Sequence, residues 1–315
     1  MLALLSITGP IFLIIGVGYL ATRLGSMDEA PPKALGQFVI QFALPALLFR
    51  SIAHRSTEQL LPWDFLIRYT AGSLLVILVG LIFIYGIRRK SFHLASIEVM
   101  GMTLSNSAFM GFPIAEQIIG LEQATDLLGV YVFVENLVMV PILITLAEAG
   151  GHGPKHPFKL VSYIVLRLIK NPLILSMLLG FGFSWFEIPV PGVMARVINL
   201  LAGASAPVAL FYIGCILATL RLRKLGAELF SIAAGKLILH PLMVTLIFVL
   251  WPIGQTTLTE SAILNAAMPM ATIYPLLGQK YGQEGLCAAS LMATTVMAFI
   301  TVTSLIGLFK VVTCC

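Results

Sequence analysis

Three ionisable residues interrupt long apolar runs, where their side chains could carry or balance charge inside a membrane. Glu135 precedes Asn136 in one run, and Lys236 and His240 lie in another. A charge inside a membrane costs roughly 2.5–3.5 kcal/mol on insertion scales, so each is a functional candidate. A buried carboxylate can carry protons, and a fixed lysine can replace a bound sodium ion, so we expect these residues to couple ions. A structural ion pair, or a lysine that reaches for the membrane surface, is the alternative.

Two further segments combine helix breakers with small or polar residues in the middle of apolar runs. They are residues 105–113 and 265–275. An unwound stretch frees backbone groups that are tolerated only where they line a cavity, and half-helix N-termini attract anions. The alternative for each segment is a simple proline kink. We expect an anion-binding site at two broken helices, with four polar candidates: Asn106, Ser107, Asn136 and Asn265.

The composition shows which elements must position these residues. Hydrophobic residues make up 59% of the 315 residues and charged residues 10%, against about 45–50% and about 25% in soluble domains. The chain is therefore an integral membrane protein built from helices of about 20 apolar residues. The net charge of +5 resides in short loops, which argues against a nucleic-acid surface. The four cysteines include no CxxC spacing, so neither a disulfide framework nor a metal site is expected.

Apolar runs bounded by charges or turn residues predict an all-α protein with ten transmembrane helices. The first five helices occupy residues 1–149, a linker occupies 150–159, and the second five occupy 160–315. The predicted spans are 4–22, 33–53, 65–87, 94–119, 126–148, 162–186, 191–219, 229–251, 258–280 and 284–309.

The lysine and arginine count predicts the orientation of these spans. The odd-numbered loops and their flanks hold 13 basic residues, the opposite side holds five, and Lys236 lies within a span. Because cytoplasmic loops are enriched in lysine and arginine, both termini are expected outside, in the plasma membrane or bacterial inner membrane.

Prolines recur at a spacing of 162 residues, which indicates an internal duplication. Pro10 recurs as Pro172, Pro45 as Pro207 and Pro113 as Pro275. Each half carries five predicted spans, and an odd number makes the second copy enter the membrane from the opposite side. Inverted repeats are typical of secondary transporters, whose substrate lies where two discontinuous helices meet.

At these residues the sequence resembles the auxin efflux carrier family, including its bacterial malonate or organic-acid permeases. Span 2 carries the residues Phe-Ala-Leu-Pro-Ala-Leu-Leu-Phe at 42–49, and span 4 carries Asn106 followed by Met-Gly-Phe-Pro at 110–113. Span 6 begins with Lys-Asn-Pro at 170–172, and span 9 carries Ala-Ala-Met-Pro at 266–269 followed by Pro275. The match covers nearly the full length, although the 5–6 connection is short, as in bacterial relatives.

The resemblance implies a fold shared with bile-acid symporters and sodium/proton antiporters. In that fold spans 4 and 9 cross as broken helices, spans 1, 2, 6 and 7 form a scaffold, and spans 3–5 and 8–10 move as an elevator-like transport domain. It also implies a homodimer through the scaffold and an organic anion as substrate. By the same match, Asn106, Pro113, Pro269 and Pro275 frame the binding site.

Other functional classes fit less well. No nucleotide-binding G-x-x-x-x-G-K-[ST] motif, H-E-x-x-H motif or G-x-S-x-G motif is present, which argues against a pump or an enzyme. No cofactor is expected, and the coupling ion could be H⁺ or Na⁺. A sodium-coupled symporter of the bile-acid type and an anion channel remain the alternatives. Four glutamates near span ends are expected to be solvated: Glu98, Glu116, Glu148 and Glu260.

Overall fold

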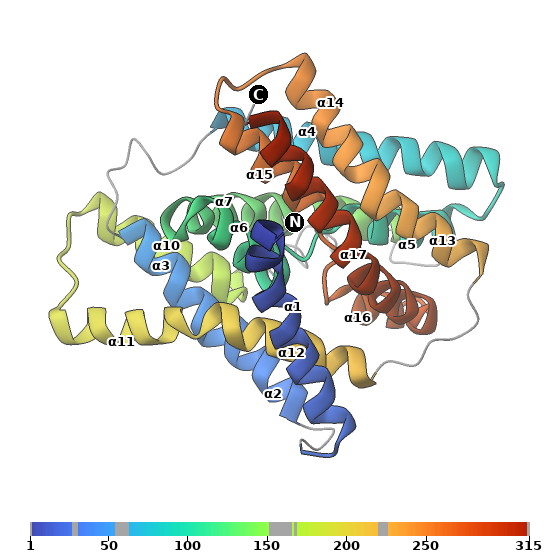
Figure 1. The fold of residues 1–315 in the computed structure, drawn as a ribbon. Helices are drawn as coiled ribbons and strands as arrows, with labels where there is room; N and C mark the ends of the chain where they lie inside the picture. The colour runs from blue at the N-terminus through green and yellow to red at the C-terminus, as the bar shows by residue number, and fades with distance from the viewer. Residues whose placement is uncertain are drawn as a thin grey trace. The chain divides into compact units, whose positions relative to one another are not determined.

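The protein folds into helices in a computed structural model of the chain (Figure 1). The structure describes residues 2–26, 31–53, 63–150, 166, 169–219 and 226–313. Apart from Gly150, the predicted linker 150–159 lies outside these residues, as does part of the predicted sixth span.

Helices overlap each of the ten predicted spans. Six described segments are long and apolar enough to cross a membrane: Ala34–Ala53, Trp63–Ile87, Leu121–Ala149, Gly192–Thr219, Ala227–Leu250 and Glu284–Phe309. Two shorter apolar helices are Gly9–Arg23 and Pro172–Trp185. The two remaining predicted spans each consist of two short helices separated by non-helical residues. The chain is therefore a multi-pass, all-helical membrane protein, while the repeat and the orientation stay predictions.

The chain divides into two compact units, and the first combines residues 1–62, 107–133 and 167–219. In unit 1, α1 packs against α12, and α3 packs against both α10 and α11 (Figure 1). Its elements are α1 (Leu2–Arg23), α2 (Pro31–Phe38), η1 (Val39–Ala43), α3 (Leu44–Ala53), η4 (Ser107–Gly111), α6 (Phe112–Ile119), α7 (Leu121–Phe133), α10 (Pro172–Trp185), α11 (Gly192–Gly203) and α12 (Ser205–Thr219).

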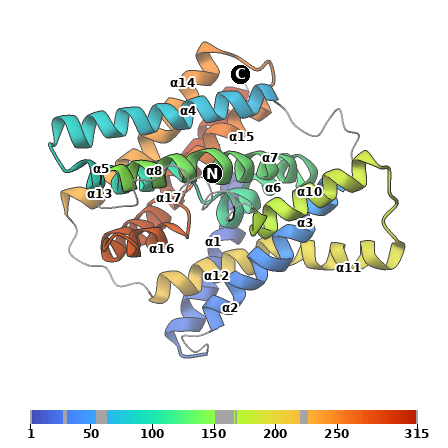
Figure 2. The ribbon, with the colours of Figure 1, turned by 180° about the vertical axis from the view of Figure 1, so that it is seen from behind.

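The second unit combines residues 63–106, 134–166 and 220–315. In unit 2, α4 packs against both α5 and α14, and α5 packs against α8 (Figure 2). Its elements are α4 (Trp63–Leu81), η3 (Ile82–Ile87), α5 (Phe92–Thr103), η5 (Val134–Met139), α8 (Val140–Ala149), α13 (Ala227–Ala234), η6 (Gly235–Leu239), α14 (His240–Leu250), α15 (Thr256–Ala266), α16 (Tyr274–Gln279) and α17 (Glu284–Thr313).

Four of the five π-helical segments in the described part of the chain share one cause that can be read from the sequence. The α-helix that follows each has proline as its second residue: Pro45 after η1, Pro113 after η4, Pro141 after η5 and Pro241 after η6. Proline lacks an N–H and its ring clashes with the carbonyl four residues earlier, so the preceding turn widens. Such π segments occur frequently at functional sites. Here η5 carries Glu135 and Asn136, and η6 carries Lys236.

Two glycines allow α1 and α12 to approach closely. A Cβ added to Gly18 would collide with the carbonyl oxygen of Phe211, and one added to Gly214 would collide with that of Ile15. The Cys215 thiol also donates to the Gly18 carbonyl at 3.4 Å. Small residues at helix crossings of membrane proteins permit this approach, which drives association through van der Waals contact.

Candidate functional site

Two helices in unit 2 are interrupted at the segments singled out in the sequence, and their unwound residues pair with each other. One break follows α5 at residues 104–106 and the other follows α15 at residues 267–273. The Asn106 N–H donates to the Pro269 carbonyl at 2.9 Å, and the Ala271 N–H donates to the Leu104 carbonyl at 3.1 Å. Each break therefore satisfies backbone groups that the other has freed, as a membrane interior requires.

Lys236 joins both breaks through its ammonium group. Its side chain is fully buried, and Nζ donates to Ser105 Oγ at 2.8 Å, to the Ala266 carbonyl at 2.6 Å and to His240 Nδ1 at 2.9 Å. An ammonium has three donors, so these three partners occupy all of them. Lys236 does not reach for the membrane surface, which removes that interpretation of the sequence.

The partners of Lys236 suit a positive charge. Ala266 is the last residue of α15, and a helix C-terminus carries partial negative charge. Glu135, on η5, also acts electrostatically on Lys236. Because His240 accepts at Nδ1, its ring proton lies on Nε2, which is 3.2 Å from Ser73 Oγ. A buried cation thus connects both breaks to the middle of α4.

A second set of polar contacts surrounds this cation. Asn265 Nδ2 donates to the Tyr69 hydroxyl at 2.8 Å, and the Tyr69 ring stacks on Phe65 at 6.3 Å between centroids. The π segment η5 packs against α4, which carries Tyr69 and Ser73. Burial of Tyr69 at 1% exposure makes its hydroxyl part of the site's interior.

Asn106 places a buried donor group at the first break. The side chain is 2% exposed, and its Nδ2 has no hydrogen-bond partner among the described residues. A buried donor without a partner costs about 1–3 kcal/mol, and such groups in a native structure call for an explanation. An anion bound at the break would supply the acceptor.

The structure places most of the predicted site residues in unit 2. Asn106, Asn265 and Pro269 belong to or adjoin the breaks, Pro275 is the second residue of α16, and Glu135 and Asn136 lie on η5. Lys236 and His240 contact each other. Ser107 and Pro113 belong to unit 1, where they lie on η4 and α6.

Three contributors escaped the sequence analysis: Tyr69, Ser73 and Ser105. A hydroxyl in an apolar run is weak evidence for a functional site, because it can donate a hydrogen bond to a carbonyl of its own helix. Tyr69 and Ser73 lie four residues apart, the spacing of one helix face, and a search for such polar pairs would have found them. Ser105 lies within the predicted break but was not singled out.

One sequence expectation about solvation is wrong. Glu98 is 2% exposed rather than solvated, because the basic residues after η3 fold back onto it. Lys90 Nζ donates to Glu98 Oε1 and to Glu228 Oε1, both at 2.6 Å, and the Ser231 hydroxyl donates to Glu98 Oε2 at 3.3 Å. This cluster ties α5 to α13 within unit 2. No group of three or more histidine, cysteine, aspartate or glutamate residues in the described part of the chain could hold a metal ion.

Comparison with known proteins places this architecture among transporters. A family model described as "Membrane transport protein" matches residues 7–306. A "Putative malonate transporter" of Rhizobium meliloti is 32% identical over 310 residues, covering 96% of this chain and 94% of the relative. An "Uncharacterized transporter YfdV" of Escherichia coli K12 is 26% identical and covers 92% of each chain. The mouse "Lysosomal cholesterol signaling protein" is 25% identical over 87% of this chain but only 33% of its own length.

Proposed function

Because this chain belongs to the membrane transport protein family, that of the auxin efflux carriers, we propose that it carries a small organic anion across the membrane, held at the breaks in spans 4 and 9. Membership confirms the resemblance drawn from the motifs of spans 2, 4, 6 and 9. It also makes the protein a transporter rather than an enzyme.

The buried Nδ2 of Asn106 is the observation that carries the proposal. A carboxylate at this break would accept the hydrogen bond that no described residue accepts. Asn136, Asn265, Pro269 and Pro275 belong to the same unit and would frame the same site, by the expectations stated above. The relative named a malonate transporter supports a carboxylate as the substrate class.

Lys236 would act as a resident cation rather than as a substrate ligand. Its three donors already have protein partners, two of them at the breaks. In a sodium-coupled carrier, the backbone carbonyls at broken helices coordinate a sodium ion. Lys236 occupies that role here, so we propose transport without sodium, with Glu135 as the proton-carrying group and His240 as the link from Lys236 to α4.

The movement we propose is elevator-like alternating access in a ten-span, inverted-repeat fold. Spans 1, 2, 6 and 7 would form the scaffold of a homodimer, spans 3–5 and 8–10 would carry the substrate, and both termini would lie outside. The separation of the chain into two compact units supports a division into a scaffold and a transport domain. The boundary differs from the one implied by the family, because it divides spans 4 and 5 at residues 106 and 133.

Uptake by purified protein in liposomes tests the proposal. We expect saturable uptake of at least one acid from a panel of malonate, other dicarboxylates and aromatic or aliphatic monocarboxylates, with no sodium requirement. Asn106→Ala should lower kcat/KM about tenfold or more, since one hydrogen bond to a charged group contributes about 1.5–3 kcal/mol.

Each alternative has its own signature in this assay. Uptake that requires sodium would favour the symporter. Flux that rises linearly with concentration would favour an anion channel. Equal uptake by wild type and Asn106→Ala would contradict the binding site.

A further inference from the structure

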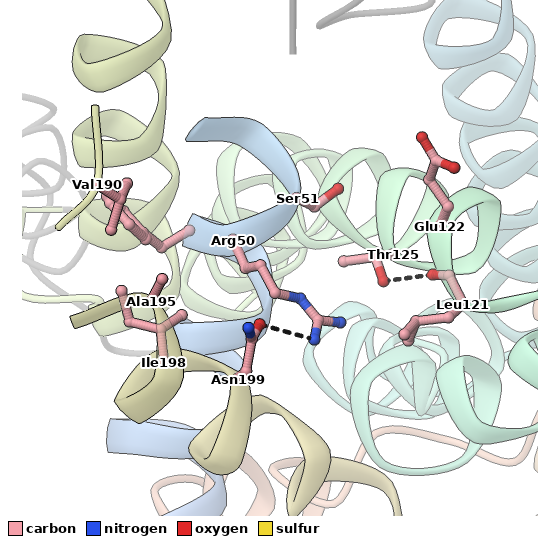
Figure 3. A pocket seen from close by; sticks show the side chains of 10 residues that line it. Arg50, Ser51, Leu121, Glu122, Thr125, Val190, Ala195, Ile198 and Asn199 are labelled. Carbon is pink, nitrogen blue, oxygen red and sulfur yellow. Dashed lines mark hydrogen bonds between the residues drawn. The ribbon is translucent and has the colours of Figure 1, made fainter. Parts of the chain in front are cut away.

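Unit 1 contains a cavity that the proposed transport site does not use. It has a volume of about 430 Å³ and lies among α3, α7, α11 and the residues just before α11 (Figure 3). Half of its lining is apolar, from the side chains of Phe49, Leu121, Val190, Ala195 and Ile198. The other side chains are polar or charged, and Arg50 is the only basic residue among them.

Hydrogen bonds orient several polar side chains around this cavity. Arg50 Nη1 donates to Asn199 Oδ1 at 3.3 Å, which orients the guanidinium. The Ser51 hydroxyl donates to Asp126 at 2.9 Å, and the Thr125 hydroxyl donates to the Leu121 carbonyl at 2.6 Å. Both hydroxyl hydrogens are therefore committed. A ligand in the cavity would meet its hydrogen-bond donors at Arg50 and at the amide of Asn199.

Arg50 also lines a second cavity in the same unit. This cavity has a volume of about 260 Å³ and extends to Pro113 and Gln117 on α6. Arg50 and Leu121 thus line both cavities.

The charges near Arg50 limit what could bind there. Glu116, which lines the second cavity, is half-buried and acts electrostatically on Arg50. Glu122 lies at the rim of the first cavity, and Figure 3 shows its carboxylate directed away from the guanidinium. One basic group among its described lining residues, together with apolar side chains over half of the lining, fits one carboxylate joined to a hydrocarbon body. A guanidinium can hold such a carboxylate through two parallel hydrogen bonds.

We propose that the cavity at Arg50 is a second organic-anion site, separate from the one at Asn106. Arg50 and Asn199 bind the carboxylate, while Phe49, Val190 and Ile198 contact the body of the ligand. This inference rests on the proposed function in one respect: the ligand is taken to be of the class that the protein transports.

Equilibrium binding of radiolabelled benzoate and malonate to the full-length protein in phosphatidylcholine nanodiscs tests the site. We expect two components for benzoate in the wild type. Arg50→Gln should remove one component, raising its dissociation constant at least about tenfold, whereas Asn106→Ala should remove the other. Arg50→Lys should bind more tightly than Arg50→Gln but less tightly than the wild type. An ammonium keeps the positive charge but cannot form the two parallel hydrogen bonds of a guanidinium.

Arg196→Gln is the matched control, because this exposed arginine lies on α11 in the same unit but does not line the cavity. All variants are compared by size-exclusion profile and melting temperature, so that misfolding is recognised separately from lost binding. An unchanged isotherm for a folded Arg50→Gln, or the same loss in Arg196→Gln, overturns the site. A single component that Asn106→Ala abolishes also overturns it while leaving the proposed function intact.

Two further arms separate the remaining outcomes. If Arg50-dependent binding persists but no acid is taken up into liposomes, the site stands and the proposed function fails. Added phosphatidylglycerol tests a lipid phosphate as the occupant of the same donors. If that lipid displaces benzoate only when Arg50 is present, the site belongs to a lipid headgroup and the assignment to a soluble anion is wrong.

Discussion

The interiors of the two units are stabilised by different kinds of contact. In unit 1, α1 and α12 approach through Gly18 and Gly214, and the buried face of α3 is formed by leucines 44, 47 and 48. In unit 2, a buried lysine, its histidine neighbour and paired unwound segments occupy the interior. Close packing tolerates little change in volume, whereas a polar network tolerates little change in charge. We therefore expect substitutions in unit 1 to affect stability first and those in unit 2 to affect transport first.

Removal of the buried cation should have the largest effect. Lys236→Met leaves the partners at Ser105 and Ala266 without a donor and leaves Glu135 without its counter-charge. Each hydrogen bond to a charged group contributes about 1.5–3 kcal/mol. With two such bonds lost at the breaks, we expect uptake to fall at least about a hundredfold.

Lys280→Met is the control for that loss. Lys280 is another lysine of unit 2 and pairs with Glu148, but its side chain is 51% exposed. Uptake by this variant should stay near wild type. Equal losses in the two variants would show that unit 2 does not depend on its buried cation in the way we describe.

The close packing of unit 1 predicts that a substitution there lowers stability without removing a group that binds substrate or ions. Gly18→Ala forces a methyl group against the Phe211 carbonyl, and overpacking of this kind costs about 1–3 kcal/mol or more. The melting temperature in detergent should fall. Gly16→Ala on the same helix should leave it unchanged, because a Cβ there meets nothing within 4 Å. Similar melting temperatures for the two variants would contradict the close approach of α1 and α12.

The charge cluster around Glu98, which shares no hydrogen bond with Lys236 among the described residues, predicts a loss of stability of comparable size. Glu98→Gln replaces a 2% exposed carboxylate that accepts from Lys90 and Ser231, and hydrogen bonds to charged groups contribute about 1.5–3 kcal/mol. Glu228→Gln changes a carboxylate that is 51% exposed and should cost at most about 1 kcal/mol. Thermal unfolding of both variants measures the difference, and a larger loss for Glu228→Gln would reverse our reading of the cluster.

The proposed proton carrier predicts the subtlest change, one in the pH profile. Glu135→Gln keeps the size of the side chain but cannot release a proton. Uptake measured from pH 5 to 8 should vary with pH in the wild type and become nearly flat in the variant. An unchanged pH profile would remove Glu135 from the coupling mechanism.

The sequence anticipates local features of this molecule better than its long-range contacts. Apolar length locates the helices, and the prolines and small polar residues locate the interruptions after Thr103 and Ala266. These signals are read from neighbouring residues. The contact of Lys236 with Ser105 and Ala266 joins segments far apart in the chain, and no periodicity encodes it. Glu98 was misjudged for the same reason, since its burial depends on Lys90 folding back from the preceding loop.

A structure determined with a transported acid bound would test the central claim most directly. We predict density for a carboxylate in unit 2, with one oxygen about 3 Å from Asn106 Nδ2 and with Lys236 still bonded to Ser105 and Ala266. Density for the acid only outside the breaks, with Asn106 Nδ2 satisfied by water or by another side chain, would contradict the account.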